Sequence, residues 1–278
     1  MKNTLKLFCF GLLTLVFATQ LYAVEERKAL ESYGKLLIVS NISYIASSTD
    51  AYRMQRCQVN VSSPQGATNL PVLIFFHGGG LTAGNRHFPH VNRNEAVVMA
   101  AGYRLSPQAT YPAFLEDAAA VVAWAFKNAT KYGGNPKRIF VSGHSAGGYL
   151  TAMVGMDARW LKPHGLTPND LAGIIPISAQ VTTHFEVKKM LKYEGEQYRP
   201  LITPEAPLYY CSSNLPPICI ITGDRKKEWP CRVEENELMA ISLRTLKHPY
   251  VEFHEIPGKN HGSVGSSVDA IIRKFMAR

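Results

Sequence analysis

Short apolar runs alternate along this chain with stretches whose apolar residues recur at helical spacing. The runs predict buried strands over 72–76, 96–101, 138–142, 173–177, 218–222 and 251–256. The spaced residues predict helices over 115–132, from about residue 146, and over 233–246. Apolar strands that alternate with helices form a parallel sheet covered on both faces. We therefore expect an α/β fold with a mostly parallel, doubly wound sheet, in which ligands bind at the carboxyl ends of the strands.

The first 23 residues follow a different pattern. Lys2 and Lys6 precede an almost wholly apolar run from Leu7 to Ala18, and the tripeptide LYA then offers a cleavage site. This layout is typical of a secretory signal peptide. The alternative is an uncleaved anchor, but that needs about 20 apolar residues. We therefore expect a signal peptide over 1–23, a single domain over 24–278, no stable membrane span, and an exported protein that is periplasmic or secreted.

The charge and the cysteines narrow the expectations further. The net charge is +9, but the basic residues are scattered and form no stripe interleaved with aromatic residues, which argues against nucleic-acid binding. Beyond the first 23 residues lie Cys57, Cys211, Cys219 and Cys231. In an oxidising compartment they could form disulfides, and buried free thiols are the alternative. Their spacing matches no zinc motif, so we expect no metal and no cofactor. The sequence gives no signal for an oligomeric state.

The segment GHSAG, residues 143–147, lies between the predicted strand over 138–142 and the helix that follows. It is G-x-S-x-G in the strand–turn–helix setting of a hydrolase nucleophile. We expect a strained backbone at Ser145, relieved by the flanking glycines, that lifts the hydroxyl clear of the sheet. The helix N-terminus beneath it favours developing negative charge. Ser145 is therefore the predicted nucleophile.

A second glycine-rich segment, HGGG at residues 77–80, follows the strand over 72–76. Attack on an acyl carbon makes the carbonyl oxygen negative, and preorganised N–H groups must receive it. We predict an oxyanion hole formed by the amides of Gly79, Gly80 and Ala146. A phosphate-binding loop is the alternative, but neither GxGxxG nor GK[ST] is present. His77 is expected to orient the loop.

A base must accept the proton of the serine hydroxyl. Three histidines follow the strand over 218–222: His248, His254 and His261. His254 lies inside the next predicted strand, and His248 follows a helix. His261 lies in the loop PGKNHG after the last strand, from which it can reach across the carboxyl end of the sheet. We therefore predict His261 as the base.

Four segments match the sequence pattern of a known family, and they occur in the same order along the chain. They are HGGG, YRLSPQATYPAFLEDA, YGGNPKRIFVSGHSAGG and the final NHG. Over roughly residues 40–275 the sequence resembles α/β-hydrolase fold serine esterases, near the hormone-sensitive-lipase-like and the acetyl or feruloyl esterase groups. The resemblance implies a Ser-His-acid triad that forms an acyl-enzyme. It also implies that Arg104, Pro107 and Asp117 support the oxyanion loop from behind.

The segment over 156–210, between the nucleophile helix and the strand that precedes the acid, is short, so the resemblance implies a small cap and an open pocket. Such a pocket suits a small or polymer-attached ester with a short or aromatic acyl group.

The triad acid departs from the family pattern. After strand 218–222 the usual G-x-x-D would place the acid at Lys226, and a lysine cannot stabilise an imidazolium. Two carboxylates lie nearby, Asp224 and Glu228. Relatives often carry acids at both the third and the fifth place after the glycine, and this chain keeps only the fifth. Glu228 is therefore preferred, Asp224 is the alternative, and a third reading is that no acid is in place.

Together these residues predict an exported serine carboxylesterase. One alternative is an amide-cleaving relative, such as an arylformamidase-like hydrolase or a small peptidase. Another is a catalytically impaired binding protein of the same fold, which Lys226 suggests.

Overall fold

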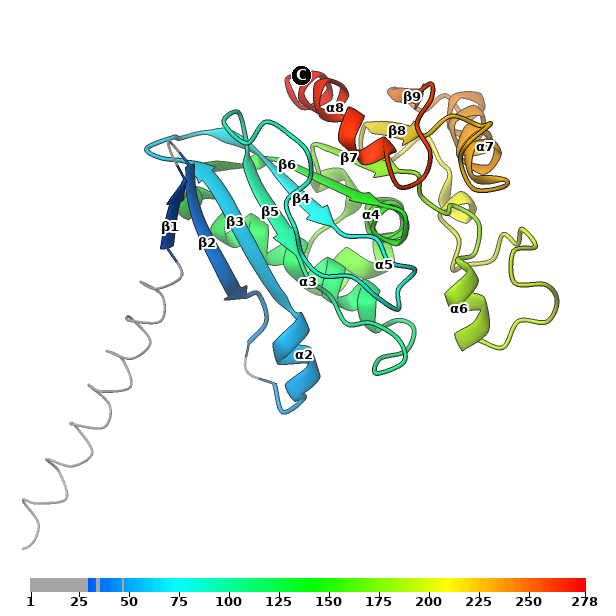
Figure 1. Ribbon diagram of the computed structural model, residues 1–278, viewed down its shortest axis with the longest axis horizontal. Coiled ribbons are helices and arrows are strands. Elements are labelled where there is room, and N and C mark those ends of the chain that lie inside the picture. The colour runs from blue at the N-terminus through cyan, green and yellow to red at the C-terminus, as the bar shows by residue number, and fades with distance from the viewer. Residues whose placement is uncertain (1–29, 34–35, 47) are drawn as a thin grey trace, which may run out of the picture.

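A nine-stranded sheet forms the centre of the protein (Figure 1). The computed structural model describes residues 30–33, 36–46 and 48–278. In the order in which they lie in the sheet, the strands are β1 (Leu30–Tyr33), β2 (Leu36–Ser43), β3 (Gln58–Pro64), β5 (Val97–Ala101), β4 (Leu70–Phe76), β6 (Gly134–His144), β7 (Gly173–Ile177), β8 (Ile218–Thr222) and β9 (Val251–Glu255).

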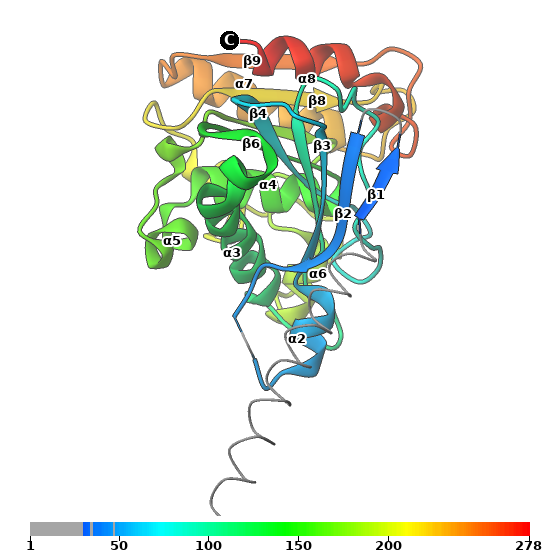
Figure 2. The same ribbon diagram turned by 90° about the vertical axis from the view of Figure 1, so that its left-hand side faces the viewer.

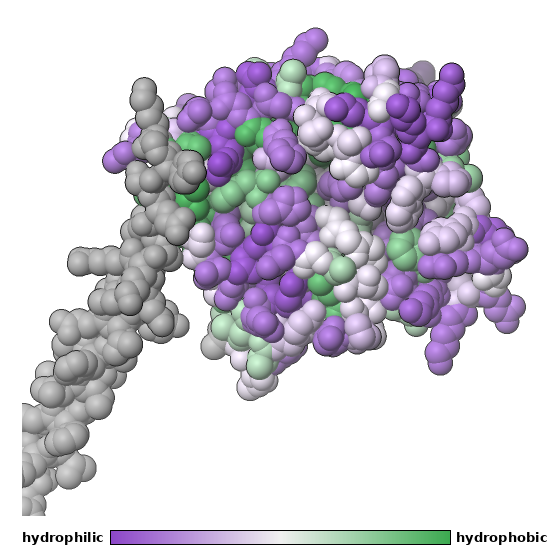
Figure 3. All heavy atoms as spheres, viewed as in Figure 1, coloured by the Kyte–Doolittle hydropathy of each residue, from purple (hydrophilic) through white to green (hydrophobic). Residues whose placement is uncertain are grey.

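The strands from β5 to β9 pair in parallel, as the sequence predicted, and the six predicted strands all form. The three N-terminal strands pair antiparallel with one another, and β3 pairs antiparallel with β5. These three were not predicted, because polar residues interrupt their apolar pattern. Hydrophobic residues reach the surface over this edge of the sheet (Figure 3). Figure 2 shows the strong twist that separates the direction of β2 and β3 from that of β8 and β9.

Helices cover both faces of the sheet. The larger core lies beneath α3 (Ala113–Asn128), α4 (Ala146–Met156) and α7 (Arg232–Thr245). A second core lies on the opposite face beneath α8 (Asp269–Met276). The doubly wound α/β-hydrolase architecture predicted from the sequence is thereby confirmed. The remaining elements are α2 (Ala51–Arg56), α5 (Ala158–Leu161), α6 (Phe185–Met190), η1 (Ala129–Tyr132), η2 (Lys162–His164), η3 (Pro168–Asp170), η4 (Pro207–Tyr210) and η5 (Val264–Ser267).

A small cap joins β7 to β8 and contains α6 and η4. In Figure 1 it projects from the side of the molecule where β7 and β8 lie. Residues 191–200 of the cap are exposed. Its inner part is tied to the main body, because the Ser106 hydroxyl donates to the buried Glu186 carboxylate at 3.1 Å. The small cap expected from the sequence is therefore present.

The predicted signal peptide, residues 1–23, lies outside the described residues. Within the part of the chain that the structure describes, no helix combines the length and the apolar character needed to cross a membrane. The four described cysteines are free thiols, with Cys57 and Cys219 buried and Cys231 exposed. Of the two readings that the sequence left open, the structure therefore has free thiols.

A buried ion pair joins α3 to the loop that follows β5. The guanidinium of Arg104 donates to both oxygens of Asp117, at 2.7 and 2.8 Å, and its backbone N–H donates to the same carboxylate at 3.0 Å. The carboxylate has no exposed surface. The neighbouring Tyr103 hydroxyl donates to the His77 carbonyl at 2.7 Å. The pair therefore fixes the segment that lies behind the HGGG loop, the place expected for Arg104 and Asp117.

We expect Asp117→Asn to lower the free energy of unfolding by about 3–5 kcal/mol, because it leaves the Arg104 cation without its buried partner. Urea unfolding followed by circular dichroism measures this change. The matched control is Glu194→Gln, at an exposed carboxylate, which should leave stability almost unchanged. Equal stability of the two variants would contradict the structural role of the pair.

Candidate active site

The turn between β6 and α4 holds Ser145 in a strained conformation. Its φ is 58° and its ψ is −117°, a region that L-residues rarely adopt. The flanking glycines are required because a side chain at either position would collide with the backbone. A Cβ on Gly143 would lie 2.3 Å from the Gly147 carbonyl oxygen, and one on Gly147 would lie 2.1 Å from the Phe76 carbonyl oxygen. The strained turn predicted from GHSAG is confirmed.

The structure brings Ser145, His261 and Glu228 together at the carboxyl end of the sheet. The Nε2 atom of His261 lies 2.8 Å from the Ser145 hydroxyl, and its Nδ1 atom lies 2.6 Å from Oε1 of Glu228. Glu228 follows β8 and His261 follows β9, and these two strands pair in parallel. Their following loops therefore leave the same edge of the sheet and can meet above it.

Glu228 is held in place by several donors. Its Oε2 accepts from the Ser178 hydroxyl at 2.8 Å and from the Gly223 amide at 3.3 Å, and its Oε1 accepts from the Trp229 amide at 3.0 Å. The side chain has no exposed surface. Burial alone would raise the pKa of this carboxyl, but the bonds from His261, Trp229 and Ser178 outweigh it and lower the pKa to about 2. Glu228 is therefore ionised at neutral pH.

Asp224, the alternative acid, lies elsewhere. Its Oδ2 accepts from the Gly258 amide at 2.7 Å and its Oδ1 from the Lys226 amide at 2.9 Å, and these bonds lower its pKa. The Glu228 amide donates to the Asp224 carbonyl at 2.8 Å, which closes one helical turn. That turn directs the side chain of Glu228 inward and leaves the side chain of Lys226 exposed. Asp224 therefore joins two loops, and Glu228 takes the place beside His261.

The HGGG loop lies against Ser145. A Cβ on Gly78 would be 3.3 Å from the Ser145 Cβ, which shows how closely the loop approaches. Gly79 and Gly80 have φ of 115° and 64°, and a Cβ on Gly79 would lie 2.2 Å from the Ala83 carbonyl oxygen. Within the described chain, neither of these two amides donates to a protein acceptor. Ala146 is the first residue of α4, so its amide has no partner inside the helix.

His77 lies behind this loop, as expected. Its ring stacks on Tyr103 with centroids 4.4 Å apart, and its Nδ1 donates to the Gly78 carbonyl at 2.7 Å. Burial lowers its pKa to about 4, so the ring is neutral at physiological pH. His77 therefore orients the HGGG loop.

Two residues that sequence reasoning missed hold His261 in place, one through its ring and one through its backbone. Trp229 stacks on it with centroids 4.7 Å apart and an interplanar angle of 22°. His144 donates from Nε2 to the His261 carbonyl at 2.8 Å, and burial, followed by the charge of His261, lowers the pKa of His144 to about 4. His144 occupies the variable place in G-x-S-x-G, and Trp229 follows the displaced acid, so no motif marked either.

The other two histidines considered as the base lie in different surroundings. His248 is buried, and its Nε2 contacts the Leu215 carbonyl at 3.0 Å. His254 lies on β9, with Nε2 at 2.7 Å from the Glu252 carboxylate. The structure brings neither to Ser145.

Comparisons with known proteins agree with this geometry. The family described as alpha/beta hydrolase fold matches residues 73–264. The carboxylesterase NlhH of Mycobacterium tuberculosis is 41% identical over 97 residues, which are 33% of this chain and 30% of that protein. The esterase LipC of the same organism is 28% identical over 218 residues, covering 69% of this chain and 53% of that one. The matches thus span between 30% and 53% of the length of these curated relatives.

Among solved structures, an esterase from Pyrobaculum calidifontis superposes with a TM-score of 0.64 at 25% identity, covering 94% of this chain and 90% of that one. A truncated carbohydrate esterase from gut microbiota superposes with a TM-score of 0.66 at 16% identity, covering 90% and 98%. The second likeness shows the fold alone. By its sequence match over 73–264 and by these relatives, the chain belongs to the α/β-hydrolase fold family, in the hormone-sensitive-lipase-like group.

Proposed function

We propose that this protein hydrolyses carboxylic esters with Ser145 as nucleophile. The observation that carries the proposal is the continuous chain of contacts from the Ser145 hydroxyl through His261 to Glu228. The names of the curated relatives, carboxylesterase and esterase, support the same reaction class. The Ser145 oxygen forms a bond to the acyl carbon while its proton passes to Nε2 of His261. The alcohol leaves with that proton and the acyl-enzyme remains.

Water completes the cycle. Nε2 of His261 takes a proton from the water, whose oxygen attacks the acyl carbon, and the proton then returns to the Ser145 oxygen as the acid departs. Glu228 fixes the imidazole through Nδ1 and stabilises its charged form. Its burial and its three other donors keep the carboxylate in one orientation throughout. The role proposed for Glu228 is thus that of the triad acid, and Asp224 has a structural role.

In both steps the carbonyl oxygen becomes negative. The amides of Gly79, Gly80 and Ala146 are the donors proposed to receive it. The positive end of the α4 dipole at Ala146 adds to this stabilisation. Because the two glycine amides have no other acceptor in the described chain, no competing bond must break before they bind the oxyanion.

We further propose that the acyl group of the substrate is aromatic or short, and a cavity lined by Trp229 supports this proposal. It has a volume of about 320 Å³ and is walled by Tyr198, Pro200, Trp229 and Pro230. Trp229, which forms one wall of the cavity, also stacks on the ring of His261. We propose that the acyl group attached to Ser145 extends toward this cavity. On the far side, Tyr198 contacts the ring of Phe185. The cavity is also lined by Gln180, Thr182, Cys231, Arg232 and Glu235. Its aromatic and proline walls suit an apolar or aromatic substituent, and its polar side chains can orient that substituent.

Export to the periplasm or the medium remains a proposal based on the N-terminal pattern, and so does a small or polymer-attached ester as substrate. The binding-protein alternative rested on Lys226. The position of Glu228 beside His261 favours a hydrolase instead.

Ester hydrolysis and serine attack are tested together. We expect a fluorophosphonate probe to label the folded protein and to label Ser145→Ala not at all, because the probe reacts with an activated serine. The wild type should hydrolyse p-nitrophenyl acetate and butyrate faster than a matched N-formyl aromatic amide. Thr151→Ala, a hydroxyl buried on the same helix, is the matched control and should keep its label. No labelling of the folded wild type would reject the proposal, and a preference for the formamide would favour the amide-cleaving relative.

The acid is tested by Glu228→Gln, which we expect to lower kcat by a factor on the order of 10³–10⁴, because the glutamine cannot stabilise the imidazolium. Asp224→Asn should leave kcat almost unchanged. Steady-state kinetics with p-nitrophenyl butyrate, with circular dichroism to verify folding, measures both. A large loss in Asp224→Asn with little loss in Glu228→Gln would reverse the assignment.

The cavity is tested by Tyr198→Ala. We expect KM for an aromatic acyl ester to rise roughly five- to tenfold, since the variant loses about 1 kcal/mol of aromatic contact. KM for the acetyl ester should stay near the wild-type value. Tyr209→Ala, at another exposed tyrosine outside the cavity lining, is the matched control. If KM rises equally for the aromatic and the acetyl ester, the acyl group does not bind in this cavity.

A further inference from the structure

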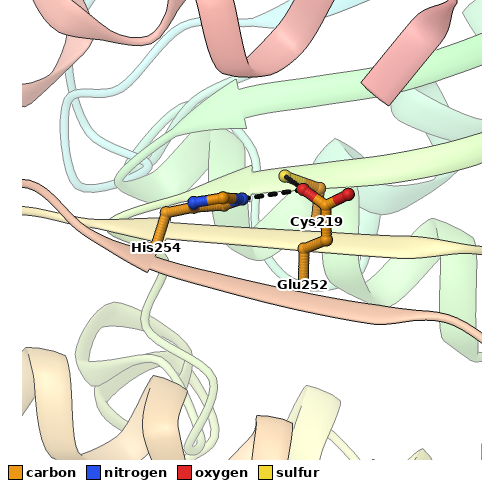
Figure 4. Close-up of side chains that lie close together, drawn as sticks. All are labelled: Cys219, Glu252 and His254. Carbon is orange, nitrogen blue, oxygen red and sulfur yellow. Dashed lines mark hydrogen bonds and ion pairs between the residues drawn. The ribbon is translucent and has the colours of Figure 1, made fainter. Parts of the chain in front are cut away.

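Three side chains with metal-binding chemistry meet on the sheet, apart from Ser145 and its partners. Cys219 lies on β8, and Glu252 and His254 lie on β9 (Figure 4). The parallel pairing of the two strands sets Cys219 directly opposite Glu252. His254 follows Glu252 by two residues, so both side chains leave the same face of β9. The three possible ligand atoms all lie within 4.8 Å of one another.

One carboxylate oxygen is the centre of this cluster. Oε2 of Glu252 lies 2.7 Å from Nε2 of His254 and 3.7 Å from Sγ of Cys219. An ionised carboxylate only accepts, so the thiol and the imidazole both direct protons at this oxygen. The other oxygen, Oε1, accepts from the Tyr250 hydroxyl and from Arg278 at 2.9 Å. The outer groups thus hold the carboxylate and leave Oε2 facing the sulfur and the nitrogen.

We propose that this cluster binds a divalent ion of borderline softness, with Zn²⁺ as the best match, through Sγ of Cys219, Oε2 of Glu252 and Nε2 of His254. Sulfur, nitrogen and oxygen donors together are the ligands that Zn²⁺ takes in proteins, whereas Mg²⁺ and Ca²⁺ take oxygen. Three protein ligands leave one tetrahedral position for water.

The burial of the ligands suits this arrangement. Cys219 has no exposed surface, whereas the side chain of His254 is 35% exposed and that of Glu252 is 20% exposed. The sulfur therefore lies at the bottom of the site, and the ion and its water enter past His254. Binding replaces the thiol proton of Cys219, which passes to the buffer, and His254 coordinates as the neutral imidazole with its proton on Nδ1.

The guanidinium of Arg278 opposes the ion. It lies over the Tyr250 ring and donates to Oε1, so it already neutralises part of the carboxylate charge. Because Arg278 donates to the same carboxylate that would bind the ion, its positive charge weakens the binding of the ion by Coulomb repulsion. The structure thus describes a site of limited affinity, which removal of Arg278 should strengthen.

The proposal is independent of ester hydrolysis. The three ligands lie on β8 and β9 themselves, whereas Glu228 and His261 lie in the loops that follow these strands. The site therefore contains none of the residues assigned to the reaction. An ion here would tie the edge strand β9 to its neighbour. Since only the folded state presents the three ligands together, the ion would stabilise that state.

Metal binding is measured on the chelator-treated full chain by equilibrium dialysis against Zn²⁺ with elemental analysis. We expect about one ion per chain, and binding at least roughly tenfold weaker in Cys219→Ser and in His254→Gln. Co²⁺ as a probe should give a thiolate-to-cobalt absorption band that Cys219→Ser removes. Mg²⁺ should not compete.

The matched controls are His90→Gln and Cys231→Ser, which alter an exposed histidine and an exposed thiol and should bind Zn²⁺ as the wild type does. If Cys219→Ser fails to fold, the partly exposed His254→Gln still decides the question. Arg278→Gln should bind more tightly, and Zn²⁺ should raise the Tm of the wild type but not that of His254→Gln. Equal zinc binding by the wild type and His254→Gln, or loss of binding in the two controls, would overturn the proposal.

Discussion

The site depends on how closely the backbone of α4 approaches the ends of β4 and β6. Any side chain at Gly147 would collide with the Phe76 carbonyl, and any at Gly143 with Gly147 itself. This approach forces Ser145 into its strained conformation with a positive φ and presents its hydroxyl to the loops above the sheet. It also brings the first amide of α4 beside the HGGG loop that leaves β4. The proposed nucleophile and the proposed oxyanion donors thus share one packing constraint, and the loops that follow the parallel strands β8 and β9 supply the remaining partners.

The position of Glu228 shows how a local turn can preserve the contact between a carboxylate and an imidazole when the carboxylate moves to another place in the sequence. The chain after β8 closes one helical turn between Asp224 and Glu228, and this turn sends the longer glutamate side chain inward. Asp224 uses its own carboxylate to join this turn to the loop of His261 through the Gly258 amide. The lysine at the family position then faces solvent, where its charge is screened from the imidazole. The interaction is kept although the motif is lost.

Features that depend on local sequence could be predicted. The apolar runs of β4 to β9 and the GHSAG turn carry their own signals, and the loop with His261 follows from chain order. The N-terminal strands escaped prediction because polar residues interrupt the apolar pattern of β2 and β3. The choice between Glu228 and Asp224 needed the direction of a turn, which depends on backbone bonds and not on residue type. Trp229, His144 and the Cys219–Glu252–His254 cluster needed contacts between strands or loops that the sequence does not bring near one another.

The proposed active site joins regions of unequal stability. Ser145 follows β6, whose central residues are fully buried, whereas His261 follows β9, an edge strand that is only partly buried along its whole length. Local opening begins where burial is least, so the edge can detach while the centre of the sheet stays intact. The hydroxyl and its base would then separate without global unfolding. If the proposed hydrolysis is correct, activity would be lost on heating when β9 opens, while the centre of the sheet stays folded.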